Sequence, residues 1–120
     1  MFILLLMIFL HICDDYYLQG ILASLKQKKW WIEHAPEPLY AHDHIVALLM
    51  HAFSWTFMIM LPIAFTLGFQ VTLPFFIVFC ANVAIHAITD HTKANLGLIS
   101  LKEDQTIHIF QILCTFACFI

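Results

Sequence analysis

The chain has 120 residues and a net charge of −3, and 62% of its residues are hydrophobic while only 11% are charged. Soluble domains carry roughly 25% charged residues, so too few charged groups remain here to cover a surface that faces water. The composition predicts an integral membrane protein, and the lack of any basic run argues against nucleic-acid binding.

Four apolar stretches follow one another along the chain, each close to the ~20 residues that cross a bilayer as a helix. They cover residues 2–26, 44–67, 71–91 and 104–120. The first is weakest at Gln19-Gly20, and it lacks both the basic start and the small-residue cleavage site of a signal peptide, so we expect a retained helix. We predict one all-α domain over residues 1–120, a four-helix transmembrane bundle with short connections.

The lysines give the bundle an orientation. All five lie in or beside the first and third connections, and the chain has no arginine: Lys26, Lys28, Lys29, Lys93 and Lys102. Because basic residues collect on the cytoplasmic side, both termini and the second connection are expected on the non-cytoplasmic side. We therefore predict a multi-pass protein of the bacterial inner (cytoplasmic) membrane, in contact with membrane lipid.

Three of the predicted helices carry a histidine and an aspartate four residues apart. The pairs are His11 with Asp15, His86 with Asp90, and Asp104 with His108. This spacing puts both side chains of a pair on one helix face. Since the helices alternate in direction, each histidine is expected about 6 Å deeper in the membrane than its aspartate.

His51 of the second predicted helix is expected at a similar depth. Polar side chains on an apolar helix must face the bundle interior, because lipid offers them no partners. The sequence thus predicts one His/Asp cluster near the cytoplasmic leaflet. The adjacent Asp14 is expected to face the membrane interface instead.

Histidine nitrogens and aspartate oxygens together are the ligand set of zinc and manganese sites. Several carboxylates gathered in a low-dielectric interior repel one another, and one or two divalent ions would relieve this repulsion. The candidate metal ligands are His11, Asp15, His51, His86, Asp90, Asp104 and His108. Asp15 and Asp90 are the candidate catalytic carboxylates, with Lys93 as a contact for an anionic substrate. Asn82 and Gln105 are expected to hydrogen-bond the ligands.

The order of these motifs carries a resemblance. The chain reads H-x3-D-x2-L-Q from His11, L-L-x-H up to His51, N-x3-H-x3-D-x2-K from Asn82, and D-Q-x2-H from Asp104. This resembles an uncharacterised family of short bacterial and phage integral membrane proteins, a domain of unknown function. More distantly, the pattern is similar to that of membrane-bound metal-dependent hydrolases, although the P-D-x-D stretch of those proteins is missing.

The resemblance implies a metal site and leaves the activity open. A membrane-embedded metal-dependent hydrolase acting on a lipid or phosphoester is the leading hypothesis. A proton or metal-ion transporter or channel is an alternative, although the halves of the helices near the termini carry almost no polar residues. A non-enzymatic accessory protein of the phage exclusion or lysis type is another. In that case the cluster would only hold helices together. A homo-oligomer that completes the site also remains open.

Overall fold

The structure, a computed structural model, describes all residues 1–120 and contains helices and no strand. In chain order the elements are α1 (Phe2–Cys13), the π-helical turn η1 (Asp14–Leu18), α2 (Leu22–Leu25), α3 (Lys28–His34), the 3-10 turn η2 (Pro38–Tyr40), α4 (Asp43–Thr66), α5 (Leu73–Ala94) and α6 (Leu101–Phe119). The predicted all-α class is confirmed.

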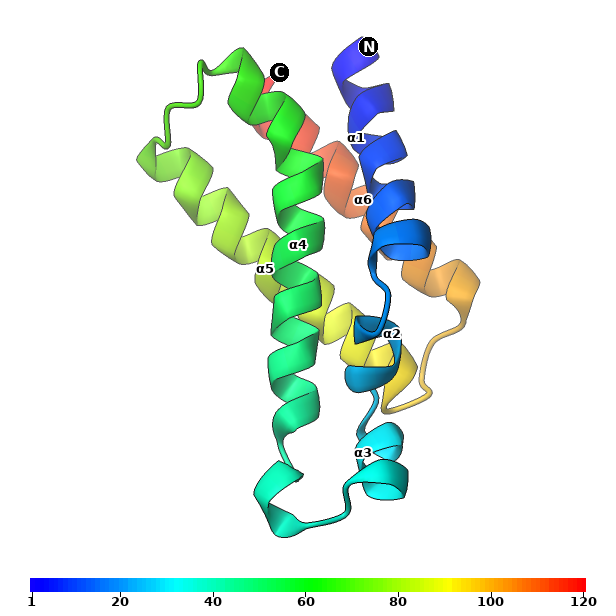
Figure 1. Cartoon of the computed structure of the whole chain (residues 1–120). Coiled ribbons are helices and arrows are strands. Elements are labelled where there is room, and N and C mark those ends of the chain that lie inside the picture. Colours follow the sequence, from blue (N-terminus) through cyan, green and yellow to red (C-terminus); the bar gives the residue numbers. More distant parts are fainter.

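The four longer helices form one assembly, in which α1 and α5 each pack against both α4 and α6. Both termini lie at the same end as the α4–α5 turn, and the short helices α2 and α3 lie at the opposite end (Figure 1). The assembly is 46 Å long. This arrangement brings the ends of three helices and the segment that follows α1 together at the end away from the termini (Figure 1).

The first predicted helix, residues 2–26, is wrong in its length. α1 ends at Cys13 and the π-helical turn η1 follows. The helical structure is then interrupted at Gln19-Gly20 before α2 begins. Gly20 has a φ of 55°, a left-handed conformation that glycine adopts without steric cost and that ends a helix. The predicted first connection, residues 27–43, likewise contains α3 and η2.

The other predicted boundaries shift by one to three residues, and side-chain caps mark the observed starts of α5 and α6. α5 begins at Leu73, where the Thr72 side chain accepts a hydrogen bond from the Phe75 backbone. α6 begins at Leu101, three residues before its predicted start, because Ser100 and Glu103 form a capping box. A capped turn is a sequence signature of a helix start, so these residues extend the helix into the predicted connection.

Two helical segments, Pro38–Thr66 and Leu73–Ala94, are long and apolar enough to cross a membrane. Four crossings were predicted. α1 has only 12 residues, about 18 Å of helix, before the π-helical turn. The first turn of α6 carries Lys102, Glu103 and Asp104, which shortens its apolar part. Length and composition therefore identify α4 and α5 as candidate spans and do not identify α1 and α6.

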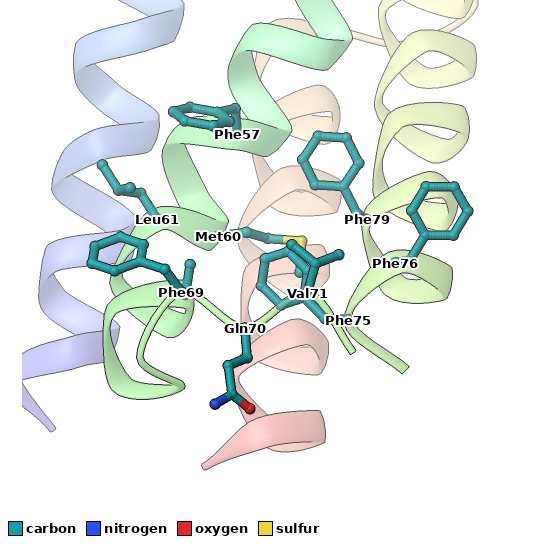
Figure 2. Close-up of a pocket in the computed structure, with 10 residues that line it drawn as sticks. Phe57, Met60, Leu61, Phe69, Gln70, Val71, Phe75, Phe76 and Phe79 are labelled. Atoms are coloured by element: carbon teal, nitrogen blue, oxygen red, sulfur yellow. The ribbon is translucent and has the colours of Figure 1, made fainter. Parts of the chain in front are cut away.

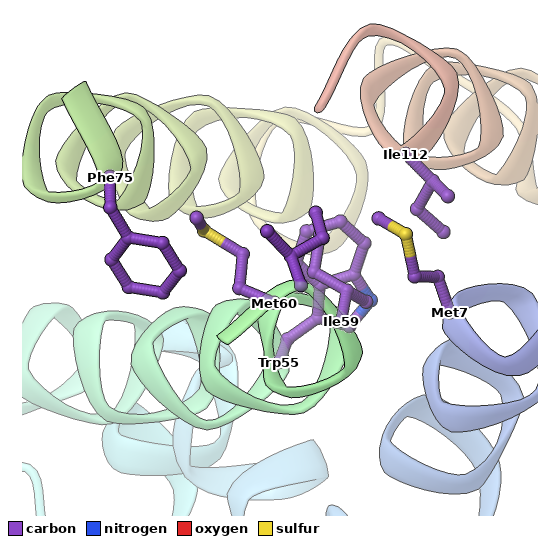
Figure 3. Packing of buried hydrophobic residues seen from close by; sticks show 7 residues of the cluster. Met7, Trp55, Ile59, Met60, Phe75 and Ile112 are labelled. Carbon is purple, nitrogen blue, oxygen red and sulfur yellow. The ribbon is translucent and has the colours of Figure 1, made fainter. Parts of the chain in front are cut away.

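The apolar core occupies the half of the assembly toward the termini. Its buried members come from α1, α4, α5 and α6 and interdigitate between these helices (Figure 3): Met7, Trp55, Ile59, Met60, Ile63, Phe75 and Ile112. Trp55 stands at its border with the polar half. The remaining buried positions are mainly polar or ionisable, so the assembly has two chemically different halves.

A groove of about 350 Å³ lies between α4 and α5 beside their connecting turn. Aromatic side chains from both helices line it, and the amide of Gln70 points away from them (Figure 2). Phe57, Phe76 and Phe69 are among its walls. The groove offers no titratable group, so the chemistry of this chain must lie elsewhere.

Candidate metal site

Four ligand atoms from three segments meet around the ring of His51 in the polar half. His51 Nε2 on α4 lies 3.2 Å from His86 Nε2 on α5. It also lies 3.4 Å from Asp15 Oδ1 on η1 and 3.3 Å from Asp90 Oδ2 on α5. Helical spacing explains the pair on α5, since residues four apart share one face.

A second group adjoins the first through the carboxylate of Asp90. Asp90 Oδ1 lies 3.3 Å from His108 Nε2 on α6 and 3.7 Å from His86 Nε2. His108 Nε2 is also 3.4 Å from Asp104 Oδ1, one helical turn earlier on α6. The two oxygens of Asp90 therefore face different groups, and this carboxylate bridges them.

These separations suit a metal ion. A tetrahedral zinc ion with bonds of ~2.0–2.1 Å holds its ligand atoms about 3.3 Å apart. Two sets of side chains have ligand atoms close enough together to hold an ion: Asp15, His51 and His86, and His86, Asp90 and His108. The predicted divalent-ion site is therefore supported at the level of its donors, which could hold a metal ion.

Unpartnered buried oxygens point to the same conclusion. Asp15 Oδ1 and Asp104 Oδ1 are buried and make no hydrogen bond, although a histidine Nε2 lies 3.4 Å from each. Nearly all buried polar atoms in folded proteins have a hydrogen-bond partner. A cation held by Asp15, His51 and His86 would satisfy Asp15 Oδ1.

His11 lies beside the two groups, and its nitrogens are already engaged. Trp55 Nε1 donates a hydrogen bond of 2.7 Å to His11 Nδ1. His11 Nε2 therefore carries the ring proton, and it lies 3.0 Å from the acceptor Gln105 Oε1. Of the seven predicted ligands, His11 and Asp104 fall outside both sets, and the other five fall within them.

Ring stacking fixes the imidazole planes. Trp55 stacks on His86 with ring centroids 4.2 Å apart, and His86 stacks on His108 at the same 4.2 Å separation. Trp55 is fully buried, so its indole is a rigid wall. Pre-oriented rings lose little freedom when they bind an ion.

Asp14 belongs to the site, and the expectation that it faces the membrane interface is wrong. Its side chain is buried, Ser54 Oγ donates a 2.6 Å hydrogen bond to Oδ1, and Oδ2 lies 3.7 Å from His51 Nδ1. A π-helical turn is wider than an α-helical one, so both Asp14 and Asp15 turn inward. Carboxylates beside the second nitrogen of a ligating histidine commonly orient that ring.

Lys26 is the second residue that the sequence did not single out. Its Nζ lies 2.6 Å from Asp90 Oδ2, and the side chain is almost fully buried. The predicted anion contact, Lys93, lies 2.7 Å from Asp104 Oδ2 and is more exposed. No sequence signal separated Lys26 from Lys28 and Lys29, because all three lie in one connection.

The charges around the site do not balance when the histidines are neutral. Four carboxylates and two ammonium groups leave a charge of −2 when the histidines are neutral: Asp14, Asp15, Asp90, Asp104, Lys26 and Lys93. Uncompensated charge in a buried environment is costly. One divalent ion, or protonation of two histidines, would balance it.

The two predicted hydrogen-bond partners differ in their contacts. Gln105 reaches the site, since its Nε2 donates to Asp104 Oδ2 at 3.0 Å and to Asp15 Oδ2 at 3.3 Å. Asn82 instead bonds Thr115 and Gln111 one turn closer to the apolar core. The amides of Asn82 and Gln111, together with the Thr115 hydroxyl, form a layer between the site and the core, here called the amide layer.

One side of the site opens into a small polar pocket of about 230 Å³. Ligand pockets usually measure ~300–1,000 Å³, so this one suits a small group. Its walls come from η1, α2, α5 and α6: Asp15, Tyr16, Gln19, Lys26, Asp90, Lys93, Leu101 and Gln105. A ligand in this pocket would touch both candidate catalytic carboxylates and Lys93.

The fold and the site together define an all-helical protein with buried His/Asp groups that could hold a metal ion. No family model, curated protein or solved structure matches this chain. The chemistry of the site must therefore be argued from its own residues.

Proposed function

We propose that this chain is a multi-pass membrane protein of the bacterial inner membrane, a metal-dependent hydrolase that holds one or two divalent ions, zinc or manganese. One observation carries the proposal. Donors from three separate segments, Asp15, His51, His86 and Asp90, converge at separations of 3.2–3.4 Å around the His51 ring.

The surface supports the membrane part of the proposal. Only 25 of the 120 residues are buried, and large apolar side chains are exposed on all four longer helices, Phe9, Phe53, Ile77 and Phe110 among them. Soluble monomers rarely expose such extensive apolar surface. With α4 and α5 as spans, α1 and α6 complete a four-helix bundle in lipid, and the lysines put both termini on the non-cytoplasmic side.

The pocket supports hydrolysis of an anionic ester. A divalent ion held by these donors would supply an activated water and a positive charge that stabilises the transition state. Asp15 lines the pocket and would take the proton of the attacking water. The water oxygen would form the new bond to phosphorus as the P–O ester bond breaks, and the leaving alkoxide would receive the proton that Asp15 had taken. Lys93 at the pocket wall would neutralise the anionic group.

A transporter is less well supported. Its path would have to continue past the amide layer toward the termini. Met60, Ile63 and Phe75 fill that region as a dry core. Dry apolar packing gives an ion or proton no partners on its way.

A metal-free helix-holding network is the second candidate, and one contact favours it. The 2.6 Å ion pair between Lys26 and Asp90 already neutralises part of the site. Protonation of two histidines would complete the balance without a metal.

Elemental analysis separates the two. The full chain, purified in detergent, is loaded with Zn²⁺ or Mn²⁺, desalted and measured by mass spectrometry. One or two ions per chain are expected, with loss in His86→Ala and retention in the matched control His34→Ala, whose ring is exposed on α3. Release of inorganic phosphate from phosphatidic acid and from p-nitrophenyl phosphate then tests hydrolysis. A chain that retains no stoichiometric metal is not a metal-dependent hydrolase.

A further inference from the structure

Lys26 has an unusual environment for a lysine at the end of a bundle. A lysine there can extend its long side chain into water and keep its charge hydrated. Lys26 instead turns inward, where its side chain is 9% exposed and its ammonium contacts Asp90. Burying an ammonium group is costly unless an anion accompanies it. Other residues must therefore hold the Lys26 side chain in its inward position, and its burial calls for a functional explanation.

The Asn95 side chain holds the backbone of this segment in place. Its Nδ2 donates 3.0 Å to the carbonyl oxygen of Lys26, and its Oδ1 accepts 2.7 Å from the Lys28 backbone. These two bonds tie the segment after Gly20 to the end of α5. Asn95 therefore helps to fix the backbone from which the Lys26 side chain turns toward the pocket.

Lys26 and Lys93 both line the polar pocket, and each holds a different carboxylate of the site. Two ammonium groups supply hydrogen-bond donors there, and Asp15 and Asp90 also line the pocket. These carboxylates would repel an anion unless a cation neutralised them. The pocket can therefore accept an anion only once the metal groups are filled.

We propose that this pocket binds a phosphate group between Lys26 and Lys93, and that the phosphate and the divalent ion bind cooperatively. The proposal rests on the metal site of the proposed function. An ion bound to Asp90 neutralises the carboxylate that partners Lys26 and repels the Lys26 ammonium, and a phosphate restores a counter-charge. A phosphate is compact enough for 230 Å³ and offers several acceptor oxygens to the lysines.

Mn²⁺ binding to the full chain in detergent tests the coupling. It is monitored by the loss of the electron paramagnetic resonance signal of aqueous Mn²⁺. Inorganic phosphate is expected to tighten Mn²⁺ binding about 10-fold, within the usual range of coupling between sites. Lys26→Met should bind Mn²⁺ and lose most of this effect. Lys29→Met is the matched control, because Lys29 is exposed and pairs only with Glu33 on α3, and it should keep the effect.

A second variant guards against misfolding of Lys26→Met. Lys93→Met lines the same pocket and is also expected to lose most of the phosphate effect. Mn²⁺ binding that phosphate does not change in the wild-type chain overturns this inference and leaves the metal site standing. A wild-type chain that retains neither Mn²⁺ nor Zn²⁺, with or without phosphate, overturns both proposals. If it retains only Zn²⁺, the phosphate effect is measured on Zn²⁺ affinity instead.

The source of the phosphate group is decided in lipid nanodiscs. Phosphatidylcholine discs with phosphatidic acid are compared with discs without it, and with inorganic phosphate added to the latter. Tightening by phosphatidic acid identifies a lipid headgroup, and tightening only by inorganic phosphate identifies a soluble phosphate. Both results support the proposal, and tightening by neither overturns it.

Discussion

The two halves of this bundle are buried alike and built from opposite chemistry. Ile59 in the apolar half and His86 in the polar half, on neighbouring helices, are both 0% exposed. Around Ile59 lie Met60, Ile63 and other apolar side chains. Around His86 lie two further imidazoles and Asp90. Equal burial therefore does not mean an equal free-energy cost of burial, which is larger for polar and ionisable groups.

The difference teaches where function lies in a chain of this size. Apolar side chains between helices in lipid gain packing contacts and cost little. Ionisable groups in the same position are expensive, and each needs a partner to remain there. A fold that needed only packing could fill both halves with apolar residues, so the polar half is the part of the bundle in which function is expected.

The largest expected effect comes from the carboxylate that bridges the two ligand groups. Asp90→Asn keeps the shape of the side chain and removes the charge that both groups and Lys26 share. We expect Zn²⁺ affinity to fall by more than about 100-fold, beyond the 10–100-fold cost of losing a partner outside the ligand set. Isothermal titration of the detergent-purified chain measures it.

Glu33→Gln is the matched control, since Glu33 is an exposed carboxylate on α3 that contacts only Lys29. Its Zn²⁺ affinity should equal that of the wild-type chain. Zn²⁺ should also raise the melting temperature of the wild type and of Glu33→Gln while leaving Asp90→Asn unchanged. An Asp90→Asn protein with wild-type affinity would mean that the polar half binds no ion through this carboxylate.

The next largest effect is expected from a substitution in the apolar half. Ile59→Ala removes a fully buried side chain from the core on α4 and should cost about 2 kcal/mol of unfolding free energy. This is the low end for such changes, because in the proposed membrane setting lipid would replace water as the reference. Metal stoichiometry should not change. Unfolding in mixed micelles measures the loss, with Phe57→Ala, an exposed site on the same helix, as the control. Loss of metal by Ile59→Ala would show that the two halves are not separable.

How much of this molecule the sequence could predict follows from the range of the forces involved. The i,i+4 pairs on α5 and α6 share faces whatever surrounds them. Spacing, together with alternating helix directions and the inward turn of polar faces, therefore predicted that His86, Asp90 and His108 would meet. The inward turn of Asp14 depends on a π-helical turn, and that turn has no reliable sequence signature. Lys26 has a long flexible side chain whose direction is set by Asn95 and Asp90, from a distant part of the chain.

A smaller effect tests whether Asp14 belongs to the polar half as an orienting group. Asp14→Asn retains the hydrogen bond from Ser54 and removes the charge 3.7 Å from His51 Nδ1. Zn²⁺ affinity should fall about 10-fold, as for other carboxylates that orient a ligating histidine. Asp43→Asn, at the first turn of α4, is the control and should leave the affinity unchanged. An unchanged affinity in Asp14→Asn would confine the site to Asp15, Asp90 and the histidines.

The smallest effect concerns the capped end of α6, which presents Asp104 and His108 to the site. Ser100→Ala removes a side-chain cap on the Glu103 backbone and should cost about 1 kcal/mol of unfolding free energy. Hydrogen bonds from Ser100 lower the pKa of Glu103 below its ordinary value of 4.5. A lowered carboxyl pKa stabilises the fold above that value and loses the contribution as the pH falls through the folded pKa. The stability difference between the wild type and Glu103→Gln should therefore shrink in acid, and a difference that stayed constant with pH would place the Glu103 charge outside the cap.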